Sequence, residues 1–178
     1  MIRILAIPGS LRASSSSDLL LKAFSELLPN GMSLQISDAT ARLPPFDDPE
    51  TLPAGVTEFH RTIKEADVIL ICTPEYAFGI PGSLKNALDW TVGTGDFYQK
   101  PVAIITASSS GDKGHAALLL VFEALSADVI PKASVVIAGI RTKFDNTGKV
   151  KDPGTLASMK DLATAIANHC RSRKQRVL

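Results

Sequence analysis

Three long runs of β-branched and other apolar residues recur along the chain, at residues 2–7, 68–72 and 102–106, and a fourth, shorter run lies at residues 135–138. Each long run is too continuous for a strand with one face in water, so we expect these strands to be covered on both faces. Strands of this kind belong to parallel sheets, in which the connections are right-handed helical crossovers. The pattern therefore restricts the chain to an α/β architecture.

Apolar residues at helical spacing lie between these runs. The predicted helices cover residues 19–28, 56–66, 84–92, 116–125 and 156–167. A serine-rich cap precedes the first helix, and Gly31 follows it as a stop signal. Residues 34–37 alternate between apolar and polar and predict the second strand, while residues 41–53 form an irregular, proline-rich loop. The alternation of strand and helix thus repeats five times.

Five alternating units predict a flavodoxin-like, doubly wound five-stranded parallel sheet with helices on both faces. In the order 2-1-3-4-5 the strand sequence reverses between strands one and three, and ligands bind at the carboxyl ends of these two strands. The two most distinctive loops of the chain follow the predicted strands 2–7 and 68–72. We therefore expect the functional site at this edge of the sheet.

Composition narrows the class of protein. A chain of 178 residues with 45% hydrophobic and 21% charged residues suits a single domain over residues 1–178. A net charge of +1 gives no broad attraction for nucleic acid or an anionic membrane, and no apolar run has the length of a membrane span. Cys72 and Cys170 lack a paired spacing, which is typical of a reduced, cytoplasmic protein.

The loop after the first predicted strand carries the components of an anion site. It reads Gly9-Ser10-Leu11-Arg12-Ala13-Ser14-Ser15-Ser16-Ser17. Backbone N–H groups at a helix N-terminus, several hydroxyls and one guanidinium favour a bound phosphate. The P-loop pattern and G-x-G-x-x-G are both missing from this loop, which favours one terminal phosphate over a pyrophosphate. The alternative is that the serines only cap the helix and that Arg12 is a surface residue.

The loop after the third predicted strand is stiffened by proline and contains two aromatic residues. Pro74 and Pro81 restrict the backbone on either side of Glu75-Tyr76-Ala77-Phe78-Gly79-Ile80. N–H and C=O groups held in this way can meet the polar edge of a flat ligand, with Tyr76 and Phe78 nearby. The alternative is that both rings pack against a helix or a second subunit, and for Phe78 we favour that interpretation.

Other chemistries find little support in the sequence. His60, His115 and His169 lack metal-ligand spacing, and the serine hydrolase pattern G-x-S-x-G is missing. Residues 47–50 contain three carboxylates in a proline-rich connection and are interpreted as a solvated turn. The basic residues of 171–176 are interpreted as the solvated end of a helix. We therefore predict no metal site.

The two loops closely resemble those of the NAD(P)H-dependent FMN reductases, a family that includes chromate, quinone and azo-dye reductases. The residues that match its motifs are Gly9, Ser10, Leu11, Arg12 and Ser15 in the first loop, and Pro74, Glu75, Tyr76, Pro81, Gly82, Leu84, Lys85, Asn86, Ala87, Asp89 and Trp90 in the second. The resemblance covers nearly the whole chain. Ser17 and Ala77 stand where family members usually have Asn.

The resemblance implies that FMN is the cofactor and NADPH or NADH the reductant. It implies phosphate contacts from Ser10, Arg12, Ser15 and Ser17, and flavin contacts at the edge of the ring from the loop after the fourth strand. The implied cofactor-binding set is Ser10, Leu11, Arg12, Ser15, Ser16, Ser17, Pro74, Glu75, Tyr76, Ala77, Ala107, Ser108 and Gly111. No side chain is assigned a catalytic role, because FMN carries the chemistry.

The implied activity is transfer of a hydride from nicotinamide to FMN, followed by reduction of a quinone, free flavin, azo dye or metal oxyanion. A non-enzymatic electron carrier or redox sensor of the same fold is the alternative, although carriers usually present a strongly acidic surface. A domain that has lost FMN is a third reading. The resemblance also implies a homodimer or homotetramer, with contacts through residues 83–92. Lys85, Asn86 and Asp89 are expected to form a structural polar network, and Trp90 to be an anchor in the core or the interface.

Overall fold

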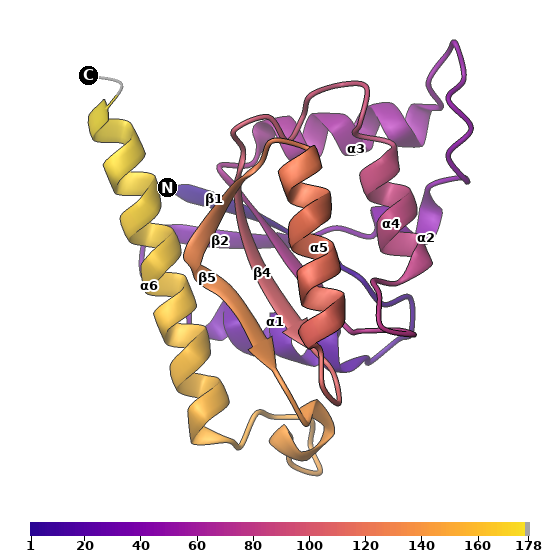
Figure 1. Ribbon diagram of the computed structural model, residues 1–178. Helices are drawn as coiled ribbons and strands as arrows, with labels where there is room; N and C mark the ends of the chain where they lie inside the picture. Colours follow the sequence, from indigo (N-terminus) through magenta and orange to yellow (C-terminus); the bar gives the residue numbers. More distant parts are fainter. Residues whose placement is uncertain (177–178) are drawn as a thin grey trace.

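The computed structural model describes residues 1–176. At its centre, five parallel strands lie in the order β2-β1-β3-β4-β5 (Figure 1). The strands are β1 (Ile2–Pro8), β2 (Met32–Ile36), β3 (Val68–Thr73), β4 (Pro101–Ala107) and β5 (Asp128–Ile137). The predicted flavodoxin-like order is confirmed, and it reverses between β1 and β3 as expected.

Helices cover both faces of the sheet (Figure 1). One face is covered by α1 (Ser16–Glu26) and α6 (Pro153–Arg176), and the other by α3 (Ala54–Glu65), α4 (Gly82–Asp89) and α5 (Asp112–Ala124). Two shorter elements are α2 (Ala39–Arg42) and the 3₁₀ turn η1 (Ile140–Lys143). The sheet is therefore doubly wound, as the alternation of strand and helix predicts.

Alternate residues of each central strand enter two separate cores. In β1, Ile4 and Ala6 belong to the core under α1 and α6, whereas Leu5 and Ile7 belong to the core under α3, α4 and α5. Every residue of β3 and β4 is buried. Burial of each aliphatic side chain contributes about 1.5–3 kcal/mol to the stability of the fold. These strands therefore form a stable base for the loops that follow them.

The edge strands differ most from the prediction. β5 begins at Asp128, although the sequence indicates only residues 135–138. Pro131 and Lys132 interrupt the apolar pattern of β5, and the pairing register with β4 shifts between Val102 and Ile104. β2 begins at Met32, two residues before the predicted start, because its exposed residues give only a weak alternation.

Helix lengths differ where the helices leave the core. α5 starts at Asp112, before the predicted start at residue 116. The prediction began late because the first turn of the helix is polar and carries no apolar periodicity. α6 extends on both sides of the predicted 156–167, beginning at Pro153 and reaching Arg176. Within the basic end, Arg173 is not simply solvated, because its guanidinium lies 2.6 Å from Asp128 Oδ2. The side chains of Lys174 and Arg176 lie outside the described set.

The proline-rich loop packs on α4 and the residue after it. Trp90 is 2% exposed, and its Nε1 donates to Pro44 O at 2.9 Å. The ring of Phe46 meets the Trp90 ring edge to face. Asn86 donates to the same Pro44 carbonyl and accepts from the Phe46 N–H. Trp90 is thus a core anchor within this chain. Of the polar network expected on α4, Asn86 bonds the proline-rich loop, and Lys85 and Asp89 form a separate ion pair.

Candidate functional site

The carboxyl edge of the sheet brings together four loops. Because the strand order reverses there, the loop after β1 lies directly against the end of β3, and Gly9 donates its N–H to Cys72 O at 2.8 Å. A side chain on Gly9 would collide with Thr73, since an added Cβ would lie 2.1 Å from Thr73 Oγ1. The loops that the sequence singles out therefore meet, and glycine permits their close approach.

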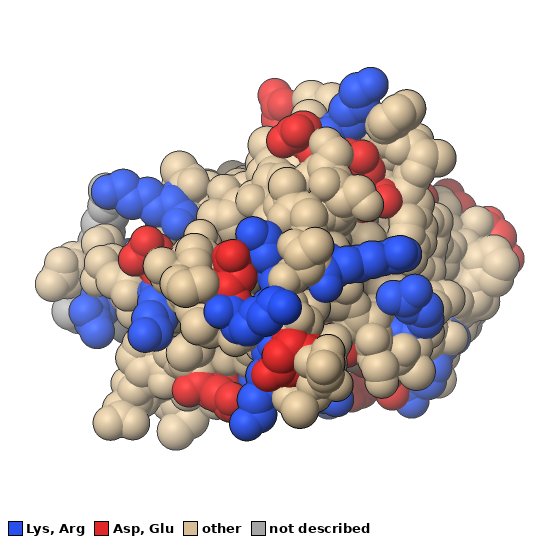
Figure 2. All heavy atoms as spheres, turned by 90° about the horizontal axis from the view of Figure 1, so that it is seen from below, with Lys and Arg blue, Asp and Glu red and all other residues tan. Residues whose placement is uncertain are grey.

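A hollow of about 200 Å³ opens between these loops. Its lining comes from the loops after β1, β3, β4 and β5, and consists of Ser10, Arg12, Ser15, Ser16, Ser17, Pro74, Glu75, Tyr76, Ala107, Ser108, Ser109, Ile140 and Arg141. Ten of these residues belong to the predicted set. Figure 2 views the molecule from this edge, where Lys and Arg side chains lie across the middle of the face with carboxylates among them.

The N-terminus of α1 forms the first wall of the hollow. Ser15 caps the helix, since its Oγ accepts from the Asp18 N–H at 3.2 Å and its own N–H donates to the Asp18 carboxylate. The Ser15 hydroxyl can still donate its proton to a ligand. The N–H groups of Ser16 and Ser17, in the first helical turn, have no intrahelical acceptor and are available to an anion. Serine capping and anion binding are therefore compatible here.

The loop after β3 forms the second wall, where Tyr76 begins a tight turn. Tyr76 and Gly79 exchange two backbone hydrogen bonds of 2.9 Å. Ala77 and Phe78, between them, both have positive φ, at 49° and 62°. Two successive positive φ angles are typical of a type I′ turn, in which Asn and Gly are favoured at the central positions. The Asn that is usual in the family at position 77 thus suits the backbone geometry of this turn.

Phe78 lies against Lys113 at the start of α5, and the interpretation that its ring packs against a second subunit stays a prediction. Its side chain is 69% exposed, and the ammonium group of Lys113 lies 4.0 Å from the ring centroid. Tyr76 is 54% exposed and lines the hollow with part of its surface. Two solvent-facing rings therefore stand beside the hollow, on the turn that follows β3.

Glu75 links the second wall to the third, the loop after β4. Its Oε2 accepts the Gly114 N–H at 2.7 Å, and an added Cβ on Gly114 would lie 3.0 Å from Glu75 Cγ. The Glu75 carbonyl accepts from Ser108 Oγ at 3.5 Å. Ala107, at the end of β4, is buried and lines the hollow. The Glu75 carboxylate therefore fixes the loop after β3 against α5. The Glu75 backbone carbonyl faces Ser108, in the third wall.

His115 ties α5 to the sheet behind this wall. Its Nδ1 lies 2.8 Å from Thr106 Oγ1 and its Nε2 lies 3.0 Å from Ser134 Oγ. Burial lowers the pKa of His115, because removing the ring from water disfavours its charged form. A neutral imidazole that exchanges hydrogen bonds with two hydroxyl groups has a positioning role for the start of α5.

The fourth wall was missed by sequence reasoning. Ile140 and Arg141, on η1, line the hollow, as does Ser109. η1 has only four residues, and its sequence, Ile-Arg-Thr-Lys, carries no periodic signal or motif. The sequence hint that a turn begins here is Gly139, which precedes η1 and has a φ of 62° in the structure. A turn this short can be located at the hollow only in the folded structure, where the strand ends lie together.

Three residues of the predicted set lie outside the lining of the hollow. Leu11 is 59% exposed, Ala77 occupies the tip of the turn, and Gly111 is buried at the N-cap of α5. They border the lining residues in sequence. Their contact with a cofactor stays a prediction.

Cys72 lies beneath the site and is not a reactive thiol. It is completely buried, and its Sγ donates to Ser17 O at 3.7 Å. Burial raises the pKa of the Cys72 thiol to about 12, so the group is protonated at neutral pH. Its place in the strand supports packing and excludes a nucleophilic role.

A buried pair of titratable groups lies away from the hollow. His60 on α3 pairs with Asp96 in the segment before β4, both are buried, and Thr94 Oγ1 donates to Asp96 Oδ2 at 2.6 Å.

Over residues 1–176, no group of three or more His, Cys, Asp or Glu side chains is arranged to hold a metal ion. Asp47 and Asp48 are exposed, as a solvated turn requires. In the same part of the chain, no helix has the length and hydropathy to cross a bilayer.

Comparison with known proteins gives close matches in sequence. The chain is 33% identical over 177 residues to a quinone reductase of Escherichia coli, covering 93% of each protein. It is 33% identical over 161 residues to an NAD(P)H-dependent FMN reductase of Pseudomonas aeruginosa, covering 85% of each. These relatives have names of the kind that the two loop motifs suggest.

Solved structures match in fold. An NAD(P)H:(acceptor) oxidoreductase of Paracoccus denitrificans superposes with a TM-score of 0.83 at 23% identity, covering 97% of this chain and 98% of the other. An FMN-dependent NADH-azoreductase of Bacillus anthracis, solved with FMN, gives 0.60 at 17% identity, covering 96% and 100%. The model of the family described as NADPH-dependent FMN reductase matches residues 2–142, from β1 to η1. The chain therefore belongs to the NADPH-dependent FMN reductase family, a family of oxidoreductases, as its two loop motifs predict.

Proposed function

We propose that this protein is an FMN-dependent NAD(P)H oxidoreductase that reduces a small-molecule acceptor such as a quinone, free flavin, azo dye or metal oxyanion. The observation that carries the proposal is the hollow at the reversal point of the strand order. It combines the N-terminus of α1, several hydroxyl groups and two guanidinium groups with a proline-stiffened aromatic turn. The unit proposed to bind FMN spans residues 1–178.

The residues present fit the phosphate end of FMN. The free N–H groups of Ser16 and Ser17, the hydroxyl of Ser15 and the guanidinium of Arg12 are donors suited to a phosphate dianion. Ser17 is buried at the position where Asn is usual, and its hydroxyl can still donate, with a shorter reach than an amide. The replacement therefore leaves a donor in place.

The size of the hollow suits part of the cofactor rather than all of it. Pockets for whole ligands usually enclose about 300–1,000 Å³, whereas this hollow measures about 200 Å³. We place the phosphate and the sugar chain inside it and the ring system along the loop of Pro74, Glu75 and Tyr76. One ring face then stays open to nicotinamide and to the acceptor.

The protein residues hold and orient the reactants. Bound FMN would supply the hydride and electron-transfer chemistry between NAD(P)H and the acceptor, so no side chain would need to act as acid or base for the first half. Pro74 and the Tyr76 turn fix the backbone that faces the ring edge, and Glu75 holds this turn against α5. The Ser108 hydroxyl, half-buried at the end of β4, can turn from the Glu75 carbonyl to a ligand oxygen.

The test is the visible spectrum of the purified protein with FMN added, followed by anaerobic addition of NADPH and then of a quinone. We expect a bound flavin that bleaches on addition of NADPH and recovers on addition of the quinone. A flavin that binds but never bleaches would instead indicate an electron carrier or sensor. Failure to bind any flavin would reject the proposal.

We further propose that the protein forms a homodimer or homotetramer through residues 83–92, and that it acts in the cytoplasm. The exposed side of this segment carries Lys85, Asp89 and the 63% exposed Val92. A second subunit there would extend the rim of a shallow site. Light scattering of the FMN-loaded protein tests the assembly, and a fully active monomer would contradict it.

A further inference from the structure

The backbone that precedes Arg141 is held at the hollow by hydrogen bonds between two loops. β5 ends at Ile137, and its carbonyl accepts the Ser108 N–H at 3.2 Å. Beyond β5, Gly139 N donates to Ser109 O at 3.2 Å and Ile140 N donates to Ser108 O at 3.1 Å. Ile140 is 5% exposed and belongs to the core. The backbone on which Arg141 sits is therefore fixed relative to the loop after β4.

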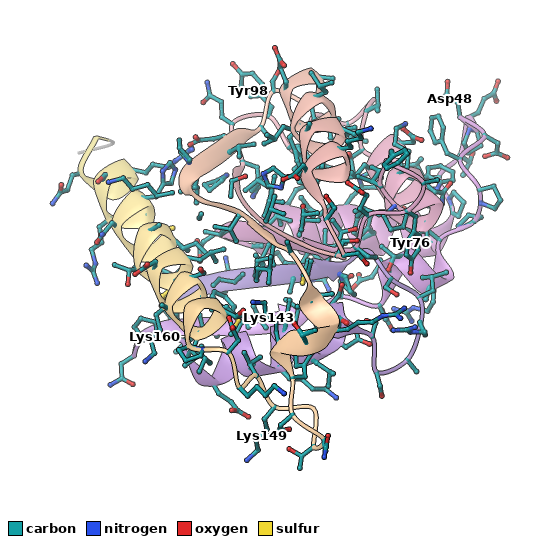
Figure 3. The ribbon with its side chains drawn as sticks, turned by 60° about the horizontal axis from the view of Figure 1, so that its bottom comes forward. Asp48, Tyr76, Tyr98, Lys143, Lys149 and Lys160 are labelled. Carbon is teal, nitrogen blue, oxygen red and sulfur yellow. The ribbon has the colours of Figure 1, made fainter. Side chains whose placement is uncertain are left out.

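The other side of η1 is fixed to α1. Phe144 and Val150 form an isolated bridge that closes the hairpin after η1. In this hairpin Gly148 packs on α1, since a Cβ added there would lie 3.2 Å from Leu19 Cδ2. Figure 3 shows Lys143 on η1 and Lys149 on the hairpin, with Tyr76 farther along the same edge. η1 thus lies between the wall formed by α1 and the wall formed by the loop after β4.

The helix N-terminus and Arg12 together leave part of the charge of a full phosphate dianion unbalanced, and a second cation on the lining would balance it. A phosphate monoester carries about −1.5 to −2 charges at neutral pH, whereas a helix N-terminus supplies roughly half a positive charge. The charged lining residues are Arg12, Arg141 and Glu75, and the Glu75 carboxylate is already bonded to the Gly114 N–H. Lys143 is unsuited to the role because it pairs with Asp152 at 3.2 Å.

We infer that Arg141 binds the phosphate of FMN opposite Arg12, and that this second guanidinium selects FMN over riboflavin, which lacks the phosphate. The inference rests on the proposed function. Arg12 comes from the loop after β1, while Arg141 comes from η1, between α1 and the loop after β4. Two guanidinium groups on separate walls surround an anion in a way that donors from α1 alone do not.

The experiment measures the Kd of FMN and of riboflavin for the wild-type protein and for Arg141→Gln, by quenching of flavin fluorescence. We expect the Kd of FMN to rise about tenfold or more, as for loss of a charge-assisted hydrogen bond, while the Kd of riboflavin stays within about twofold. The salt dependence of FMN binding should also weaken. Lys149→Gln, which removes an exposed charge from the neighbouring hairpin, is the matched control and should leave both constants unchanged.

Three outcomes would overturn the inference. An unchanged Kd for FMN in Arg141→Gln means that Arg141 makes no phosphate contact. An equal loss of FMN and riboflavin binding means that the substitution has damaged the wall, and Arg141→Lys, which keeps the charge, would then fail to restore the preference for FMN. If the wild-type protein binds neither flavin, the proposed function itself fails and the inference fails with it. These results are distinguishable because each gives a different pattern across the two ligands.

Discussion

Gly9 and Thr73 lie so close together that a Cβ added to Gly9 would be 2.1 Å from Thr73 Oγ1 and 2.6 Å from Thr73 Cβ. Thr73 is completely buried at the end of β3, and the contact includes its backbone, since the added Cβ would lie 3.1 Å from Thr73 Cα. The contact joins the two strands on either side of the point where the strand order reverses. The candidate site is built directly above it.

Gly9→Ala should therefore destabilise the protein by about 2–4 kcal/mol, because the added methyl group overlaps buried atoms. The free energy of unfolding in urea measures this loss. Gly55→Ala is the matched control, since Gly55 lies in α3 with no atom within 4 Å of an added Cβ. We expect the control to be neutral or stabilising by up to about 1 kcal/mol. Equal stability of Gly9→Ala and the wild type would contradict the predicted overlap.

The carboxylate of Glu75 should act on FMN binding through the position of its loop. Glu75→Ala leaves the Gly114 N–H without its acceptor, so we expect about 1–2 kcal/mol lower stability and weaker FMN binding. Glu75→Gln keeps an acceptor oxygen and should retain most of both properties. Fluorescence titration with FMN and urea unfolding measure the two effects. If both variants remain stable and lose FMN binding equally, the carboxylate instead contacts the ligand.

Ala77 occupies a backbone conformation that favours glycine. Its φ of 49° lies in the left-handed region, where a Cβ is unfavourable. Ala77→Gly should raise the free energy of unfolding by about 0.5–1 kcal/mol. Ala157→Gly, on the exposed side of α6, should instead lower it by a similar amount. Two losses of the same size in urea unfolding would argue against the type I′ turn.

The stability of the protein should fall as the pH decreases below about 6.5, through His115. Burial holds the pKa of His115 below its usual value, so the unfolded chain gains a proton in this range before the folded chain does. The slope should not exceed about 1.4 kcal/mol per pH unit, and it should end once the pH is below the lowered pKa of the folded state. His115→Gln should flatten the slope. Urea unfolding between pH 5 and 8 makes the comparison, and an unchanged slope would assign the effect to another group.

Asp96 should control stability in a more acidic range. Burial alone would raise the pKa of Asp96, but the hydrogen bond from Thr94 and the interactions with His60 and Lys64 outweigh it and hold the pKa below its usual value. Stability from Asp96 is therefore present above about pH 4 and is lost as the pH falls towards the lowered pKa.

Asp96→Asn should cost about 2 kcal/mol at pH 7 and flatten the acid limb of the profile. FMN affinity should not change, because Asp96 precedes β4 whereas the hollow lies after the strand ends. Thermal unfolding between pH 3 and 7 and a parallel FMN titration separate the two readouts. A loss of FMN binding without a loss of stability would contradict this separation.

The strands that could be predicted are those whose burial on both faces requires an unbroken run of apolar residues in the sequence. The runs that became β1, β3 and β4 are apolar throughout because both faces are covered, and topology then places their loops at one edge. β5 was only partly visible, because Pro131 and Lys132 interrupt it and its register shifts against β4. The family resemblance added chemistry that periodicity does not contain.

The candidate site was predictable in its first three walls and not in its fourth. Ser10 to Ser17 and Pro74 to Tyr76 carry motifs, whereas Arg141 is one basic residue among many until the loop contacts of Ile140 are known. The conformation of Ala77 likewise could not be predicted, because an alanine in a sequence does not indicate a positive φ. The orientation of Glu75 towards α5 depends on the close approach of Gly114, which is a property of the assembled loops.

The walls of the hollow span residues 10 to 141, and this breadth couples ligand binding to folding. A chain that has not assembled all four strand ends has no complete site, so a ligand that fills the hollow binds only the native state. At a free concentration one hundred times its Kd, such a ligand would add about 2.7 kcal/mol to the stability of the fold. The cellular lifetime of this protein should therefore rise and fall with the supply of its cofactor.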